Sequence, residues 1–170
     1  MNNIFTTQTV CNLHEVKSKL CTIDAVKWRD DVAHKPKLRT YVLFKKEFES
    51  EAYIKSFIPK SERSTFAKLR CGILPLHIET GRYTNKKVED RICELCDANV
   101  IEDEQHFVCS CNLYSELRQE MYTKISESDI NFRDMPLCEK FVYLMSKKQK
   151  LMSRFVHKAF QVRRKKLYES

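Results

Sequence analysis

Glycine and proline are scarce in this chain, with 2 and 4 among its 170 residues. Because these two residue types occupy most tight turns, their scarcity argues against a turn-rich β sandwich and excludes a collagen-like repeat. A hydrophobic content of 42% argues against disorder. The sequence therefore predicts a mostly α protein, and 170 residues are enough to bury the core of one compact unit.

Long apolar runs are also missing. No stretch approaches the roughly 20 consecutive apolar residues that cross a bilayer. Residues 1–6 lack the basic and apolar zones of a signal peptide. We therefore expect a soluble intracellular protein, nuclear or cytoplasmic, that has no membrane partner.

Cysteine, in contrast, is abundant, with 8 residues. Inside cells, thiols serve as metal ligands more often than they form structural disulfides. Cys93 and Cys96 form a C-x-x-C pair, whose tight turn aims two thiolates at one ion, and His106 and Cys111 follow at ligand-like distances. The four side chains would fill a tetrahedral shell. Zinc is the default ion for this donor set, and a full shell predicts a structural role.

The fourth ligand has a competitor in Cys109, three residues beyond His106 and on the same side of the chain if that segment is helical. A lone C-x-x-C pair can also be two buried thiols or a redox pair. A redox pair normally begins a helix in a βαβ unit, and this sequence shows no such pattern. The spacing therefore favours a metal and leaves Cys109 and Cys111 as alternatives.

The net charge of +8 is concentrated at one end. From residue 147 onward there are nine basic residues and one acid, so 9 − 1 = +8, and the first 146 residues sum to zero. This concentration predicts an anionic partner, most often nucleic acid, although basic tails are also often solvated helix faces. The expected contacts in this tail are Arg163, Arg164, Lys165 and Lys166.

A second set of candidate contacts precedes the cysteine pair. Arg82 could pair with a phosphate and Tyr83 could stack on a base, with Asn85, Lys86 and Lys87 beside them. Equally, Tyr83 could belong to the core and the others to an ordinary loop. The metal site itself should repel phosphate, because seven acids surround it: Glu89, Asp90, Glu94, Asp97, Glu102, Asp103 and Glu104.

Apolar spacing predicts the helices. Spacings of three and four residues predict helices over about 10–32 and over 61–71, the second ended by Gly72 in the left-handed conformation. Further helices are expected from about 113, after Pro136 and from about 149. Residues 38–57 should form two short helices, with a strand at 40–44 as an alternative. Between 72 and 111 we expect loops, with extended pieces near 73–78 and 101–107.

These predictions divide the chain into three segments: 1–60 (amino-terminal helical region), 61–125 (helix and metal-binding core) and 126–170 (carboxy-terminal helices with the basic tail).

Several short motifs occur in a defined order: LRTY (38–41), AKLRCG (67–72), IETGRY (78–83), RIC (91–93), EDE (102–104) and CNLY (111–114). The series resembles the CCHC zinc-binding region that follows the reverse transcriptase domain in non-LTR retrotransposons, and it covers most of the chain. In that family a small loop and a tyrosine follow the last ligand, which favours Cys111, before Tyr114, over Cys109. The resemblance implies a zinc knuckle inserted in a small helical domain that helps a reverse transcriptase engage its RNA template or DNA target.

Catalysis is not part of the expectation. The Asp30-Asp31 pair lacks the Tyr-x-Asp-Asp hairpin that holds catalytic metals in such polymerases, and no endonuclease motif is visible. We therefore expect a detached fragment that is not an enzyme: a zinc-stabilised module that binds RNA or DNA, with a reverse transcriptase or other retroelement protein as a further partner. The alternatives are a zinc-stapled protein-interaction module and a decaying transposon fragment without a selected activity.

Overall fold

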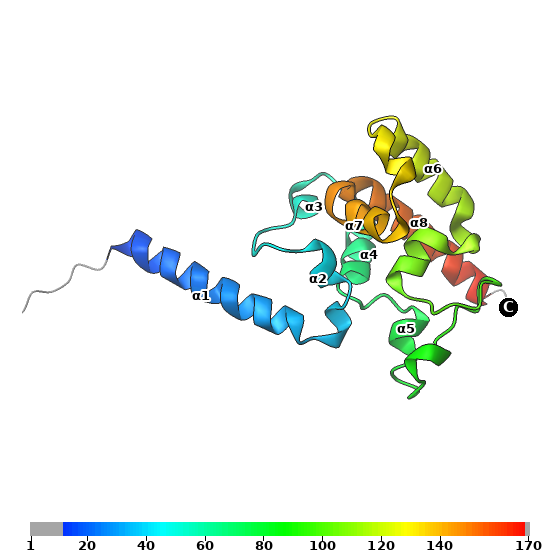
Figure 1. The fold of residues 1–170 in the computed structure, drawn as a ribbon, viewed down its shortest axis with the longest axis horizontal. Coiled ribbons are helices and arrows are strands. Elements are labelled where there is room, and N and C mark those ends of the chain that lie inside the picture. The colour runs from blue at the N-terminus through cyan, green and yellow to red at the C-terminus, as the bar shows by residue number, and fades with distance from the viewer. Residues whose placement is uncertain (1–11, 169–170) are drawn as a thin grey trace, which may run out of the picture.

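A computed structural model describes residues 12–168, and the chain in this range is mostly helical (Figure 1), as predicted. Extended pairing in the described range is confined to one antiparallel bridge between Ile92 and Ile101. None of the helices in this range combines the length and apolar character that a membrane crossing requires.

The α-helices are α1 (Leu13–Ala33), α2 (Tyr41–Phe44), α3 (Ala52–Lys55), α4 (Lys60–Arg70), α5 (His77–Thr80), α6 (Ser115–Ser126), α7 (Leu137–Lys147) and α8 (Gln149–Tyr168). Short 3-10 turns cover Pro36–Leu38, Val88–Asp90, Asn112–Tyr114 and Ile130–Asp134, and a π-helix covers His106–Ser110.

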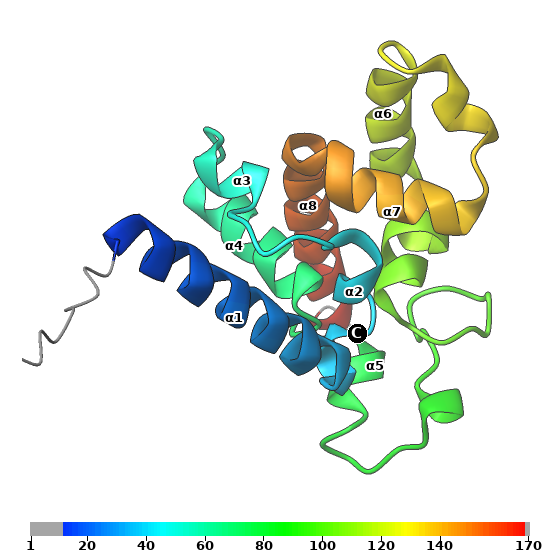
Figure 2. The ribbon, with the colours of Figure 1, turned by 60° about the vertical axis from the view of Figure 1, so that its left-hand side comes forward.

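The core forms around α8, against which α4, α6 and α7 pack (Figure 2). Its buried side chains belong to one cluster that draws on all three predicted segments, with Tyr53, Phe66 and Val156 as examples. Tyr53 and Phe66 meet edge to face, with ring centroids 5.1 Å apart. Burial of such aromatic and aliphatic groups is the main driving force for this arrangement. Because α8 lies at the centre, its removal would dismantle the core.

Most predicted boundaries are confirmed. The helix expected over 61–71 is α4, and Gly72 follows it with a φ of +62°. The helices expected from 113, after Pro136 and from 149 are α6, α7 and α8. The alternative strand at 40–44 is wrong, because this segment contains α2. The extended pieces near 73–78 and 101–107 are shorter than expected, because α5 begins at His77 and the π-helix begins at His106.

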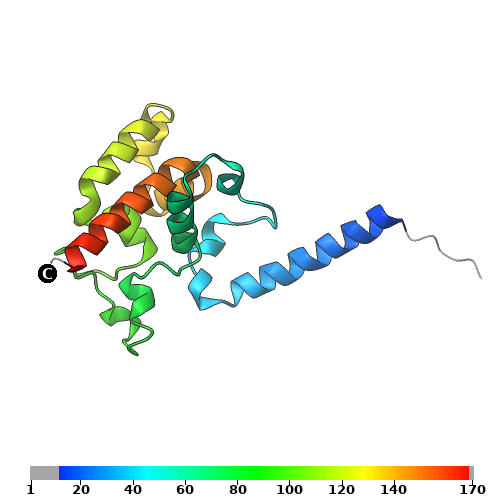
Figure 3. The ribbon, with the colours of Figure 1, turned by 180° about the vertical axis from the view of Figure 1, so that it is seen from behind.

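Helix α1 was predicted from apolar spacing, and it is present, but its apolar face does not join the core. Figures 1 and 3 show α1 projecting from the body of the protein. Leu13, Leu20 and Ile23 are 82, 55 and 61% exposed. Attachment occurs near the other end of the helix, where the rings of Trp28 and Phe48 lie 5.7 Å apart. Val10, which belonged to the same predicted helix, lies outside the described residues.

Gly72 provides a test of the chain path beside α4. A Cβ atom at this position would lie 2.0 Å from the carbonyl oxygen of Lys37, and the positive φ adds strain for any L side chain. We expect Gly72→Ala to lower the free energy of unfolding by about 2 kcal/mol or more, measured by urea denaturation. Gly81→Ala is the comparison, because Gly81 has a φ of −60° and the three atoms nearest its Cβ, 2.7 to 2.9 Å away, belong to the side chain of Arg91, which can shift more easily than backbone. Equal losses in the two variants would contradict this account.

Candidate metal centre

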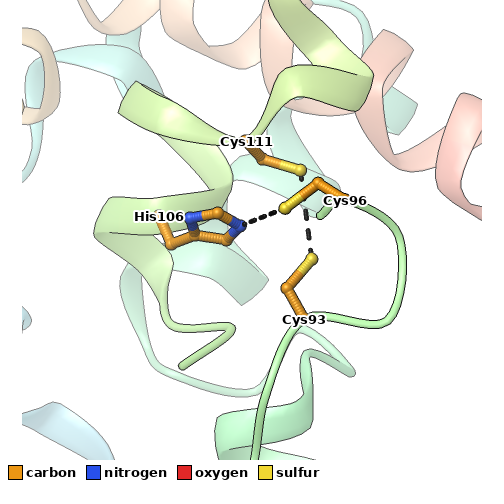
Figure 4. Close-up of side chains that lie close together, drawn as sticks. All are labelled: Cys93, Cys96, His106 and Cys111. Atoms are coloured by element: carbon orange, nitrogen blue, oxygen red, sulfur yellow. Dashed lines mark hydrogen bonds between the residues drawn. The ribbon is translucent and has the colours of Figure 1, made fainter. Parts of the chain in front are cut away.

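Four side chains, Cys93, Cys96, His106 and Cys111, converge in the structure (Figure 4). Their potential ligand atoms all lie within 4.8 Å of one another. The Sγ atoms of Cys93 and Cys111 are 4.0 Å apart, and Cys96 Sγ is 3.4 Å from His106 Nε2. A disulfide would bring two sulfurs to about 2.05 Å, so these cysteines are free thiols. The group could hold one metal ion.

Cys93 and Cys96 lie on a chain reversal, and backbone contacts between its two arms close the reversal. Ile92 pairs with Ile101, and the N–H of Cys93 donates to the carbonyl oxygen of Val100 at 2.8 Å. Asn99 has a φ of +51°, a left-handed conformation that asparagine tolerates better than most residues and that helps to turn the chain. The reversal holds Cys93 and Cys96 on one loop, where Leu95 and Ile101 are partly buried against the core cluster.

The π-helix His106–Ser110 positions the other two candidate ligands. Its wide turn lets the N–H of Cys111 donate to the carbonyl oxygen of His106 at 2.9 Å, five residues back along the chain. This geometry brings the fifth residue, not the third, to the side of the histidine. Asp103 fixes the start of the turn, because its Oδ1 accepts from the N–H of His106 at 2.7 Å. Wide turns of this kind are frequent at functional sites.

Cys109 lies outside the group. It is buried beside Tyr122, and burial raises the pKa of its thiol to about 12. A neutral buried thiol behaves as a small apolar side chain. The structure thus brings Cys111 together with the three other predicted ligands and leaves the competing cysteine in the core.

The imidazole of His106 is oriented for ligation through Nε2. Its Nδ1 lies 3.0 Å from Ser110 Oγ, and the hydroxyl of Ser110 itself donates to the carbonyl oxygen of His106 at 3.5 Å. A proton on Nδ1 would donate to Ser110 Oγ and would leave the lone pair of Nε2 facing the sulfurs. Burial lowers the pKa of His106, although Asp103 opposes this effect. Both features favour the neutral imidazole that a metal requires.

The thiols have the opposite requirement, because the thiolate is the ligand. Burial raises the pKa of Cys93 to about 12 and also raises the pKa of Cys111. A bound divalent cation would therefore have to displace protons from these two groups. Metal binding at this centre is consequently expected to weaken as the pH falls.

A buried ion pair lies behind the centre and joins it to α8. Glu102 Oε2 accepts hydrogen bonds from Arg163 Nη2 and from the N–H of His77, both at 2.8 Å, while Glu102 Oε1 lies 4.0 Å from Cys93 Sγ. Glu102 and Arg163 are 1 and 2% exposed. Burial raises the pKa of the Glu102 carboxyl, and the Arg163 guanidinium opposes this effect.

This ion pair corrects one prediction from the sequence. Arg163 was expected to contact nucleic acid, but its side chain is buried and bound to Glu102. The two residues are 61 positions apart, and no local pattern in the sequence could pair them.

The sequence also did not predict the role of a second arginine. Arg118 is buried and donates from Nη1 to the carbonyl oxygen of Cys111 at 3.0 Å. It thereby supports the end of the π-helix that carries a candidate ligand.

The other predicted contact residues are exposed. Tyr83 is 74% exposed, so its alternative placement in the core is wrong. Arg82 and Tyr83 both reach the buried carboxylate of Glu79, at 3.4 Å each. The remaining exposed positions in the two predicted sets are Asn85, Lys86, Lys87, Arg164, Lys165 and Lys166.

The acidic face near the centre is smaller than expected. Glu104, like Glu102, is buried, and its Oε1 lies 2.7 Å from Arg39 Nη2. Five of the seven acids around the candidate ligands therefore remain to repel a phosphate: Glu89, Asp90, Glu94, Asp97 and Asp103.

The donor set limits what this centre can do. Three thiolates and one imidazole complete a four-coordinate shell, which leaves no open position where water or a substrate could bind. The arrangement therefore suits a metal that holds the chain together. Comparisons of the chain with models of protein families, with curated proteins and with solved structures find no match.

Proposed function

We propose that this chain is a zinc-stabilised module that binds nucleic acid. Zinc accords with the donor set, because it takes thiolate and imidazole ligands in tetrahedral sites. With the usual Zn–S and Zn–N bond lengths, tetrahedral geometry separates two sulfurs by about 3.8 Å and a sulfur from a nitrogen by about 3.6 Å. The corresponding distances of 4.0 Å (Cys93 to Cys111) and 3.4 Å (Cys96 to His106) are close to these values.

The observation that carries the nucleic-acid proposal is the concentration of basic side chains on α8. This helix exposes Arg154, Lys158, Arg164, Lys165 and Lys166 on its surface while its apolar face fills the core. A rigid helix that presents several cations is an electrostatic footprint for a phosphate backbone. The acids beside the metal centre would repel the phosphate backbone from that part of the surface. The ordered motifs that resemble the region after a retrotransposon reverse transcriptase support the same function, with such a polymerase or another retroelement protein as a further partner.

A second function is favoured by a separate observation. The apolar side chains of Leu13, Leu20 and Ile23 lie exposed along α1, which projects from the body. Exposed apolar faces of this kind are typical of protein interaction sites. A protein-interaction module would use α1, whereas a nucleic-acid-binding module would use α8, so substitutions on the two helices separate the two functions.

The nucleic-acid proposal predicts binding that depends strongly on salt. Four phosphate contacts to a single strand give a slope of about −3 for log K against log salt, which is a loss of about 50-fold between 50 and 200 mM. Fluorescence anisotropy with labelled RNA and DNA oligonucleotides measures this slope.

Deletion of α8 is unsuitable as a control, because Phe155 and Val156 belong to the core. Leu20→Gln on α1 is a matched control that should leave the affinity unchanged. Absence of binding at 50 mM salt would end the proposal.

A further inference from the structure

A groove of about 710 Å³ runs beside the carboxy-terminal half of α8, where α6 packs against it. Leu117 of α6 and Val162 of α8 are the apolar residues of its lining, and both are partly buried against the core cluster. The other five residues of its lining are polar, and all of them belong to α8: Lys158, Gln161, Arg164, Lys165 and Tyr168. A second, much smaller depression of about 20 Å³ shares Leu117 and Lys158 with the groove and is lined also by Lys124 and Arg154.

Helical geometry aligns the polar side chains along this groove. Arg154, Lys158, Gln161, Lys165 and Tyr168 follow one another at spacings of four, three, four and three residues, so they lie on one face of α8. At 1.5 Å per residue, Arg154 and Lys165 are separated by about 16 Å along the helix axis. The groove thus presents a row of cations along its length.

The lining of the groove and of the smaller depression carries more positive than negative charge. Lys124, Arg154, Lys158, Arg164 and Lys165 contribute five positive charges, and Glu120 contributes one negative charge, a balance of 5 − 1 = +4. The carboxylate of Glu120 is already occupied, because Lys124 Nζ lies 2.6 Å from Oε1 and Lys158 Nζ lies 3.7 Å from Oε2. An anionic ligand would therefore meet an electropositive groove.

We propose that this groove binds a single strand of RNA or DNA, an inference that rests on the proposed nucleic-acid function. Phosphates would lie along the cations of the α8 face, while bases would lie over Leu117 and Val162 and stack on Tyr168, which is 82% exposed. Basic grooves combined with aromatic platforms are typical of single-strand binding. A duplex fits less well. A helix that reads the major groove must protrude from the protein, and here α6 flanks the basic face of α8.

The test compares two pairs of lysines that carry equal charge. Lys158→Gln/Lys165→Gln alters the groove, and Lys86→Gln/Lys87→Gln alters the exposed loop before the metal centre. Binding of a labelled 12-nucleotide poly(U) or poly(dT) strand, and of a blunt duplex of equal length, is measured by anisotropy at several salt concentrations. The groove variant should bind the single strand about 10-fold or more weakly, and its salt slope should fall by about 1.4. Tyr168→Ala should weaken binding about 10-fold without changing the slope. Circular dichroism and zinc content confirm that each variant is folded.

Each outcome is informative. If the loop variant loses affinity and the groove variant does not, the chain still binds nucleic acid but the groove is not the site. Tighter binding of the duplex than of the single strand also overturns the inference while leaving the proposed function intact. If the unaltered chain binds neither oligonucleotide at low salt, both proposals fail together.

Discussion

Cys111→Ser is expected to remove zinc from the purified protein, whereas Cys109→Ser is expected to leave the zinc content at one ion per chain. Cys111 Sγ lies 4.0 Å from Cys93 Sγ within the four-residue group, and Cys109 lies in the core beside Tyr122. Loss of a thiolate ligand should lower zinc affinity by more than about 100-fold, since even outer-shell changes cost 10- to 100-fold. Elemental analysis after dialysis against a weak chelator measures the difference.

The structural consequences of the two substitutions should also differ. Metal binding to such a site is coupled to folding, so Cys111→Ser should unfold the chain reversal that carries Cys93 and Cys96. Hydrogen exchange would then report faster exchange of the N–H of Cys93, which donates to Val100 in the native state. Cys109→Ser replaces a buried apolar thiol by a hydroxyl and should cost about 1 to 3 kcal/mol of overall stability without this local effect. The reverse pattern, with zinc lost only from Cys109→Ser, would contradict the ligand assignment.

The sequence predicted the metal group because its information is local. Only two residues separate Cys93 from Cys96, and His106 and Cys111 follow within one short segment. The choice between Cys109 and Cys111, however, depends on whether the turn after His106 is α or π. Periodicity cannot distinguish these turns over five residues, and only the family resemblance favoured Cys111. The structure supplies the physical reason, which is the hydrogen bond between the N–H of Cys111 and the carbonyl oxygen of His106.

Other features could not be predicted because they depend on distant parts of the chain. The spacing of Leu13, Leu20 and Ile23 indicates a helix, but it does not reveal whether another element covers that face, and in the described residues they stay exposed. Likewise, a basic residue near the carboxy terminus looks like a surface cation. Arg163 is different from Arg164 only because its position on α8 faces Glu102.

Arg163→Met is expected to lower the free energy of unfolding by about 3 to 5 kcal/mol, because it leaves the carboxylate of Glu102 buried without its partner. The loss should be large because Glu102 also lies 4.0 Å from a sulfur of the metal group. With zinc bound, three thiolates give that group a net charge of −1. Urea denaturation in the presence of zinc measures the change. The double variant Glu102→Gln/Arg163→Met removes both charges, so its loss should be smaller than the sum of the two single losses.

The same substitution separates a structural arginine from one that contacts nucleic acid. Under conditions where the variant stays folded, Arg163→Met should leave the salt slope of oligonucleotide binding unchanged, since the side chain of Arg163 is 2% exposed. Lys165→Gln, two residues further along α8 and exposed, should lower that slope by about 0.7 and leave the unfolding free energy within about 0.5 kcal/mol of the original. If Arg163→Met lowers the slope by a similar amount and has little effect on stability, then Arg163 contacts the nucleic acid and its pairing with Glu102 does not hold the metal centre to α8.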